Sequence, residues 1–280
     1  MKRKLEKSIK DNLLGSSLWI NELANDCENQ KAFLAIRDDK VGIYHKGGLL
    51  FCFDKKGFKT HIKYAAALDP NRKKYLTEDE LTNLRMTPNF ERNYDRIKEN
   101  CSKYSGVEAS GVSAIYERSP YFSNIDIVVL DIEVSFESFS EESNQDRIDL
   151  LLFNTKTKEL KFVEAKHYSN KDIWSTKTPK VIQQITRYEN QINQRYSHIL
   201  SEYEEYIKTL FEIFGINLPY PTKIDPKVTL LIFGYDSDQS KGRLKKLIRD
   251  NPEYKGINLY TKGDISSLST ETLWNAKSKK

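Results

Sequence analysis

The second half of the chain alternates short apolar runs with polar segments, which predicts a mixed α/β domain. Short runs rich in β-branched and aromatic residues indicate strands over 125–136, 147–153, 160–166, 228–235 and 257–260. Two helices are expected between them, a long one from about residue 179 with apolar residues every three or four positions, and a basic one over 239–250. The run 228–235 is apolar at nearly every position, so it should form a strand buried on both faces.

The first half of the chain shows a helix followed by a change to strand patterning. The helix is expected over 5–24, and the four strands over 33–37, 41–44, 49–53 and 58–64. Turn-forming residues such as Gly47-Gly48 separate these strands, so they should form an antiparallel meander. Further helices are expected after a capping box at 77–80, over 90–104 and over 113–118. We place the domain boundary near residue 120, which gives an N-terminal α+β domain (1–120) and a second domain (121–280).

Composition narrows the class of protein only modestly. The chain of 280 residues is 38% hydrophobic and 30% charged, with a net charge of +5, which is compatible with a nucleic-acid partner. Its three cysteines form no CxxC pair, which argues against a disulfide framework or a structural zinc site. The apolar runs are too short to cross a bilayer and no signal-peptide core follows the basic start, so we expect a cytoplasmic protein with no membrane partner.

The two expected strands over 147–153 and 160–166 bring three charged side chains together. Closing the polar turn between them symmetrically pairs Asn154 with Glu159, and the same register places Asp149 opposite Glu164. Directly paired residues of an antiparallel hairpin share a face, with Cβ atoms about 5 Å apart. Lys166 lies two residues beyond Glu164 and therefore shares that face.

This arrangement of charge predicts a divalent metal ion. Two carboxylates side by side destabilise a strand pair, and a cation bound between them relieves the repulsion. Hard oxygen ligands of this kind suit Mg²⁺, with Mn²⁺ as a substitute, rather than zinc. Glu-x-Lys occurs two further times in the chain, at Glu159 and at Glu253, but only the Glu164 copy closes an apolar strand with a carboxylate opposite.

Asp149 followed by Glu164-Ala165-Lys166 on the next strand resembles the PD-(D/E)xK nuclease superfamily, although Ile148 stands where the family has proline. Gln184 and Tyr188 match the QxxxY motif of its RecB-like branch. The resemblance covers residues 123–260 and implies a restriction-endonuclease-like mixed sheet flanked by helices. It implies that Asp149, Glu164 and the backbone carbonyl of Ala165 bind the metal. The catalytic set it implies is Asp149, Glu164, Lys166 and Gln184.

Further residues are expected near this site. Glu133, on the first strand of the domain, is our candidate for a third metal ligand, with Glu117 as its competitor. The loop after the Glu-x-Lys strand interleaves lysines with aromatic residues, a composition suited to binding a nucleic-acid strand. With Tyr188, the candidate substrate-binding residues are Lys171, Trp174 and Lys177. The basic helix over 239–250 is expected to be a solvated outer helix.

These observations predict a Mg²⁺-dependent nuclease, with DNA as the expected substrate and phage defence, restriction or repair in a prokaryote as its setting. Two alternatives stay open. One is a nuclease-like domain that binds nucleic acid without cutting it. The other is a structural or interaction protein in which the carboxylates and Lys166 form only a buried ion-pair cluster. The N-terminal domain is left with three roles: presenting substrate, binding a partner protein, or forming a homo-oligomer.

Overall fold

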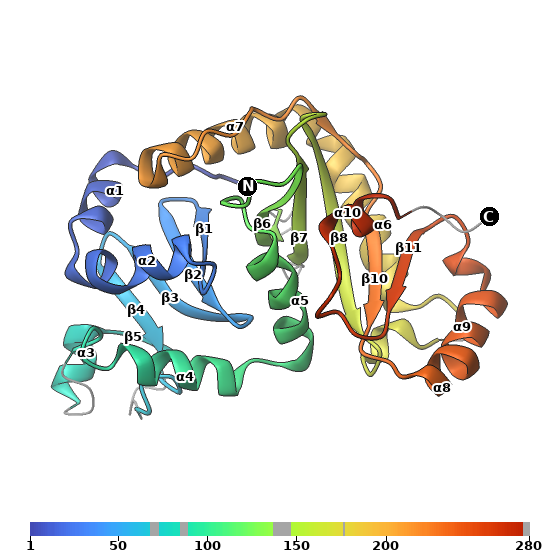
Figure 1. Ribbon diagram of the computed structural model, residues 1–280, viewed down its shortest axis with the longest axis horizontal. Coiled ribbons are helices and arrows are strands. Elements are labelled where there is room, and N and C mark those ends of the chain that lie inside the picture. The colour runs from blue at the N-terminus through green and yellow to red at the C-terminus, as the bar shows by residue number, and fades with distance from the viewer. Residues whose placement is uncertain (68–72, 85–88, 137–146, 176, 277–280) are drawn as a thin grey trace. The chain divides into compact units, whose positions relative to one another are not determined.

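The computed structural model describes residues 1–67, 73–84, 89–136, 147–175 and 177–276 (Figure 1). The chain divides into two compact units, one of residues 2–113 with 205–218, and one of Met1, 114–204 and 219–280. The second is called the C-terminal unit below, and the first the N-terminal unit. The chain first passes from the N-terminal unit to the C-terminal unit between residues 113 and 114, close to the boundary predicted near residue 120. The return of 205–218 to the N-terminal unit was not predicted.

The N-terminal unit is built around an antiparallel sheet. In the described part of this unit the sheet has five strands in the order β1-β2-β3-β4-β5, which confirms the predicted meander. The strands are β1 (Phe33–Arg37), β2 (Lys40–His45), β3 (Gly48–Asp54), β4 (Gly57–His61) and β5 (Tyr75–Thr77). The last of them, β5, was not predicted, because three residues carry too little pattern to be recognised in the sequence.

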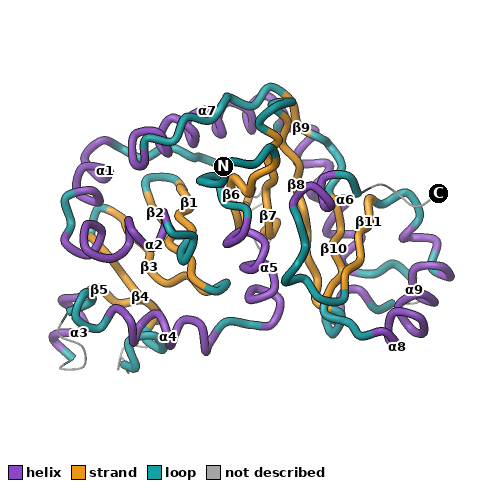
Figure 2. Tube along the Cα trace, in the orientation of Figure 1, coloured by secondary structure: helices purple, strands orange, loops and turns teal. Residues whose placement is uncertain are grey.

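Helices before and after this sheet complete the unit (Figure 2). They are α1 (Lys7–Leu14), a π-helical turn (Trp19–Leu23), α2 (Ala24–Glu28), α3 (Glu78–Asn83) and α4 (Tyr94–Tyr104). The helix predicted over 5–24 is interrupted, since α1 ends at Leu14 and the π-helical turn begins at Trp19. The capping box is confirmed: the Thr77 hydroxyl accepts from the Glu80 amide, and Glu80 accepts from the Thr77 amide. Helix α5 (Val107–Arg118) is longer than predicted, and its residues divide between the two units.

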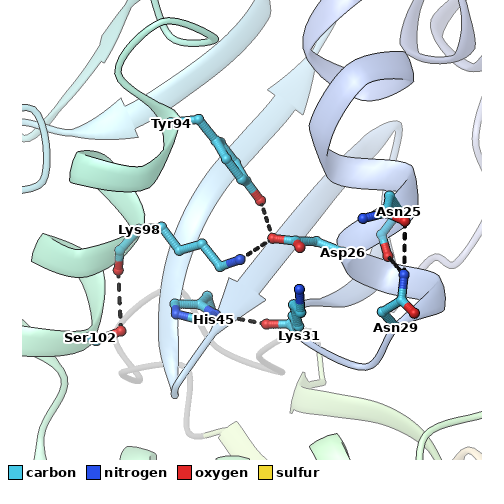
Figure 3. Close-up of polar contacts among 8 residues, drawn as sticks. All are labelled: Asn25, Asp26, Asn29, Lys31, His45, Tyr94, Lys98 and Ser102. Atoms are coloured by element: carbon cyan, nitrogen blue, oxygen red, sulfur yellow. Dashed lines mark hydrogen bonds and ion pairs between the residues drawn. The ribbon is translucent and has the colours of Figure 1, made fainter.

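A buried polar network fastens helices α2 and α4 to each other (Figure 3). The carboxylate of Asp26 accepts a hydrogen bond from the Tyr94 hydroxyl at 2.6 Å and is also paired with the Lys98 ammonium. The imidazole of His45, on β2, lies nearby with Nδ1 2.7 Å from the backbone oxygen of Lys31. The side chains of Asp26, His45 and Tyr94 are buried, so the network belongs to the core of this unit.

The buried imidazole of His45 should make the stability of the protein depend on pH. Burial lowers the pKa of His45 below its ordinary value of 6.5, and the nearby Lys98 charge lowers it further. The folded chain thus holds His45 neutral while the unfolded chain protonates it, so stability is present above pH 6.5 and is lost as pH falls below that value. We expect the free energy of unfolding in urea to fall between pH 7.5 and 5.5, by at most about 1.4 kcal/mol per pH unit for one proton.

His45→Gln should flatten that pH dependence. The pKa of His61 is lowered too, but this side chain is less buried, so His61→Gln should flatten it less. An unchanged pH profile in His45→Gln would contradict the assignment of a neutral buried imidazole.

The C-terminal unit contains a mixed sheet, as the order of predicted strands implied. In its described residues the six strands follow the order β11-β10-β8-β7-β6, with β9 paired to β8 outside that path. They are β6 (Ile127–Ser135), β7 (Arg147–Asn154), β8 (Glu159–His167), β9 (Lys223–Ile224), β10 (Thr229–Phe233) and β11 (Asn258–Lys262). β6, β7 and β8 are antiparallel, whereas β10 is parallel to both β8 and β11. Every residue of β10 is buried, as predicted for an interior strand.

Helices lie on both faces of this sheet, with α10 (Thr270–Trp274) in front of it and α6 (Lys180–Gln194) behind it in Figure 1. The predicted long helix breaks at Arg195 into α6 and α7 (Tyr196–Phe214). The basic segment forms α8 (Ser237–Gln239), a π-helical turn (Ser240–Leu244) and α9 (Lys245–Asp250). Within the described ranges, no helix combines the length and apolar character needed to cross a membrane.

Side-chain contacts show which face of β8 carries the candidate site. The ammonium of Lys161 donates to the backbone oxygen of Trp274, so Lys161 points toward α10. Successive residues of a strand alternate between faces. Glu164 and Lys166, three and five residues further along, therefore point to the opposite face, the side of α6.

Candidate active site

The register predicted for the β7–β8 hairpin is confirmed. Asn154 pairs with Glu159, Phe153 with Leu160 and Leu151 with Phe162 around the Thr155–Lys158 turn. The regular pairing ends at Leu150 opposite Val163, one position before Asp149 and Glu164. The candidate site thus begins where the backbone ladder between the two strands stops.

The Asp149 side chain accepts the hydrogen bond that a backbone carbonyl of β7 would accept if the ladder continued. Its Oδ2 accepts a hydrogen bond from the Ala165 amide at 2.7 Å. A strand residue directs its N–H and C=O toward the same neighbouring strand, so the Ala165 carbonyl also faces β7 and Asp149. The carboxylate of Asp149 and the carbonyl of Ala165 therefore border one gap between the strands.

Glu164 and Lys166 form an ion pair on the same face of β8. The Lys166 ammonium lies 2.5 Å from Glu164 Oε1. Glu164 is 0% exposed and Lys166 only 6% exposed, which is rare for either residue type. Because burying two charges costs several kcal/mol per ion before pairing, such a pair is weak evidence for stability and is more informative about function.

The electrostatics of the site favour a cation. Burial raises the pKa of Asp149 well above its ordinary range, and the negative charge of Glu164 raises it further. The Lys166 ammonium and the Ala165 amide act in the opposite direction but do not cancel these effects. A carboxylate perturbed by burial and by a neighbouring carboxylate is typical of functional sites.

Glu133 lies beside this pair of strands, and its role as a third metal ligand stays a prediction. Ile132 pairs with Leu150 and Val134 with Ile148, so Glu133 lies opposite Asp149, and its charge contributes to the raised pKa of Asp149. Its carboxylate is 3.6 Å from the Arg147 guanidinium. Among the described residues, no three His, Cys, Asp or Glu side chains are placed to hold one metal ion. The oxygen donors that the structure brings together are those of Asp149, Glu164 and Ala165.

The backbone of β6 is irregular beside the candidate site, a feature that the sequence did not predict. The pairing shifts register between Val129 and Asp131, and Glu133 has φ of +49°, the left-handed region that non-glycine residues seldom adopt. Strained backbone of this kind costs about 1–3 kcal/mol and concentrates at functional sites. Asp131 does not share the site with Glu133, because it is fully buried and accepts a hydrogen bond from the Tyr203 hydroxyl at 2.9 Å. Glu117, the competing candidate, lies on α5.

The QxxxY residues are linked to each other and to β7. Gln184 Nε2 donates to the Tyr188 hydroxyl at 2.7 Å, and that hydroxyl donates to the Arg147 backbone oxygen at 2.8 Å. Arg147 precedes Asp149 by two residues, so this chain of hydrogen bonds fixes the start of the strand that carries the carboxylate. Tyr188 is 1% exposed, so its position suits holding β7 in place rather than touching a substrate.

Removing the Tyr188 hydroxyl should therefore lower kcat with little change in KM. We expect Tyr188→Phe to reduce the turnover of any cleaved substrate about ten-fold, because a small displacement of Asp149 is costly in a positioned site. Tyr196→Phe is the matched control, since it removes a hydroxyl that accepts from Ile224 at the opposite end of β8. Equal losses of turnover in both variants would contradict the positioning role.

The loop after β8 is held firmly by residues from the end of the domain. The Trp174 indole donates to the Tyr168 backbone oxygen at 2.9 Å and packs edge-on against the Tyr168 ring. The buried amide of Asn251 donates to the backbone oxygens of Ser175 and Lys177 at 3.0 and 3.1 Å. Lys171 and Lys177 are exposed on this loop, whereas Trp174 is half-buried. Sequence reasoning did not find Asn251 or the packing of Arg243 against Trp174, because both contacts join segments some 70 residues apart.

Comparison with known proteins identifies no relative: no protein-family model matches the chain, and no curated protein or solved structure is significantly similar to it.

Proposed function

We propose that this chain is a divalent-metal-dependent nuclease that hydrolyses phosphodiester bonds, with DNA as its substrate. One observation carries the proposal: Asp149, Glu164 and Lys166 converge where the β7–β8 ladder opens, with Asp149 held on the amide between the other two residues. Resemblance of Asp149 and Glu164-Ala165-Lys166 to the PD-(D/E)xK superfamily supports it. The mixed sheet with helices on both faces is compatible with the restriction-endonuclease-like fold that we propose for this unit.

The oxygen donors of the site fit a hard divalent cation. Two carboxylates and one backbone carbonyl are donors that Mg²⁺ and Mn²⁺ prefer. Burial and the neighbouring Glu164 raise the pKa of Asp149, and a bound cation would favour its ionised form. Asp149, Glu164 and the Ala165 carbonyl would hold the ion. When bound, it would polarise the scissile phosphate and lower the pKa of a coordinated water.

The side chains of the chain itself supply the remaining requirements of the reaction. The Lys166 ammonium, which pairs with Glu164 in this structure, would donate to the phosphate oxygens as negative charge develops on them. The Ala165 amide keeps Asp149 oriented through its hydrogen bond. Gln184 and Tyr188 fix the start of β7, and the buried surroundings of Glu164 keep bulk water away from the charged groups. A setting in prokaryotic phage defence, restriction or repair is proposed from the resemblance alone.

Cleavage of a panel of nucleic acids tests the proposal. Plasmid, linear duplex DNA, single-stranded DNA and RNA would each be incubated with the chain in Mg²⁺, in Mn²⁺ and in EDTA. We expect cutting of DNA with either metal and none in EDTA, and closed circular plasmid distinguishes an endonuclease from an enzyme that needs ends. Cutting that persists in EDTA would contradict the metal-dependent mechanism, and binding without cutting on every substrate would favour the binding-module alternative.

A further inference from the structure

The C-terminal unit carries a second feature with the chemistry of a nucleic-acid site. A pocket of about 520 Å³ lies between the loop after β8 and the helical segment that ends in α9. Its lining includes Trp174, Arg243, Lys246, Leu247 and Asn251. The volume is within the range of small-molecule sites and is ample for one nucleotide.

The central contact in this pocket is a cation–π pair. The Arg243 guanidinium carbon lies 4.0 Å from the centroid of the Trp174 ring, which places the cation over the ring face rather than at its edge. Within the described ranges Arg243 has no carboxylate partner. The carboxylate on the pocket wall, Asp250, pairs instead with Arg249, at 2.6 and 3.2 Å. Arg249 offsets the charge of Asp250, and the pocket lining also carries the positive charges of Arg243 and Lys246.

The pocket is formed in advance of any ligand. Asn251 ties the loop through its two hydrogen bonds, and the Tyr254 hydroxyl donates to the Ile173 backbone oxygen at 2.7 Å. The Trp174 indole is fixed in turn by its bond to Tyr168. A rigid aromatic ring with a guanidinium held against it loses little freedom on binding, which favours affinity.

This combination is better suited to a base than to a phosphate alone. A guanidinium plane stacked on an aromatic ring offers its outer face to another flat ring, and unpaired bases stack on arginine planes in this way. Leu247 supplies an apolar wall, and the Lys246 ammonium is placed to meet the charge of an adjoining phosphate. A base within a duplex cannot enter such a pocket, because its faces are already stacked on its neighbours.

The pocket and the candidate active site belong to the same end of the sheet. β8 and β10 run parallel with Phe233 beside His167, and the Tyr168 amide donates to the Phe233 backbone oxygen at 2.7 Å. The loop with Trp174 and the helical segment with Arg243 both leave the sheet there. Glu164 and Lys166 are in the last four residues of β8, so they lie at that end too.

We propose that the Trp174–Arg243 pocket receives one unstacked nucleotide of a single-stranded nucleic acid, with the base on the Arg243 guanidinium and a phosphate on Lys246. This inference rests on the proposed nuclease function and deepens it, because it makes a single strand or an opened end of a duplex the form of substrate that is held near the site.

Binding in EDTA tests the pocket separately from catalysis. Fluorescence anisotropy would compare a labelled oligothymidylate, the same strand in a duplex, and an abasic strand of equal length. We expect Trp174→Ala and Arg243→Ala each to weaken binding of the oligothymidylate about ten-fold or more, the usual effect of losing one stacked base, with less than a three-fold change for the duplex. Arg243→Lys should resemble Arg243→Ala, because lysine keeps the charge but not the plane.

The control and the contradicting results are equally specific. Lys241→Ala removes a cation from the same helical segment outside the pocket lining and should change binding less than three-fold. Full affinity in Arg243→Lys, or equal affinity for the abasic strand, would overturn the base-binding pocket. Loss of cleavage by Lys166→Ala alongside unchanged binding in Trp174→Ala and Arg243→Ala would refute the pocket and leave the nuclease proposal standing. Binding that depends on Trp174 and Arg243, with no cleavage of any substrate, would support the pocket and refute the nuclease proposal.

Discussion

Replacing Lys166 with alanine is expected to lower the rate of metal-dependent cleavage by about 10³-fold, the usual effect of losing one group that stabilises developing charge. Lys166 is paired to Glu164, and it is buried where the β7–β8 ladder opens. Without it, charge developing on the phosphate would lose the ammonium that the site offers in addition to a bound metal ion. Asp149→Asn should have a comparable effect, because an amide binds a divalent cation far more weakly than a carboxylate. Initial rates at saturating substrate measure both.

The chain supplies its own control for this experiment. Glu253-Tyr254-Lys255 repeats the Glu-x-Lys spacing of the site but follows a turn instead of closing a buried strand, and Lys255 is exposed. Lys255→Ala should leave the cleavage rate within a factor of about two, as surface substitutions usually do. A Lys166→Ala protein that folds and still cuts at the wild-type rate would remove Lys166 from the mechanism.

Replacing Asp26 with alanine is expected to have the largest effect on stability, a loss of about 3–5 kcal/mol in the free energy of unfolding. The Asp26 carboxylate accepts from the Tyr94 hydroxyl at 2.6 Å and balances the Lys98 ammonium (Figure 3). Its removal leaves a largely buried lysine without a counter-ion and a buried hydroxyl without an acceptor, and each of these is costly. Urea denaturation followed by circular dichroism measures the loss.

Two further variants separate the charge from the hydrogen bond. Asp26→Asn keeps an acceptor for Tyr94 but removes the counter-ion, whereas Tyr94→Phe removes one hydrogen bond and should cost about 1–2 kcal/mol. We expect the order of stability to be wild type, Tyr94→Phe, Asp26→Asn and Asp26→Ala. A loss below about 1 kcal/mol in Asp26→Ala would mean that the network contributes little to the N-terminal unit.

The parts of the site that sequence reasoning predicted are those controlled by local chemistry. The polar turn at Thr155–Lys158 and the alternating apolar residues beside it determine the register of the hairpin. Extending that register by one position, beyond the last regular pair of Leu150 with Val163, predicts Asp149 beside Glu164, and the Glu164 charge does act on Asp149. The meander and the capping box at Thr77 are local in the same sense, and the structure confirms both.

The parts that sequence reasoning missed depend on contacts between distant segments. The left-handed backbone of Glu133 and the register shift in β6 have no local signal, since glutamate and valine are ordinary strand residues there. The helical spacing of apolar residues continues through α7, so it does not indicate that residues 205–218 belong to the N-terminal unit. Arg243 looked like part of a solvated helix because its contact with Trp174 joins elements after two different strands.

A Mn²⁺ titration of the metal-free protein tests the central claim most directly. Calorimetry would compare three proteins: the wild type, Asp149→Asn and the control Asp54→Asn. The control removes a carboxylate that is paired with Lys59 in the N-terminal unit. We predict saturable Mn²⁺ binding by the wild type and by Asp54→Asn, and no Mn²⁺ binding by Asp149→Asn. The Tm should rise with added Mn²⁺ in the wild type and in Asp54→Asn alone. No Mn²⁺ binding, or binding that Asp149→Asn leaves intact, would show that Asp149, Glu164 and Lys166 are a buried ion-pair cluster and not a metal-dependent active site.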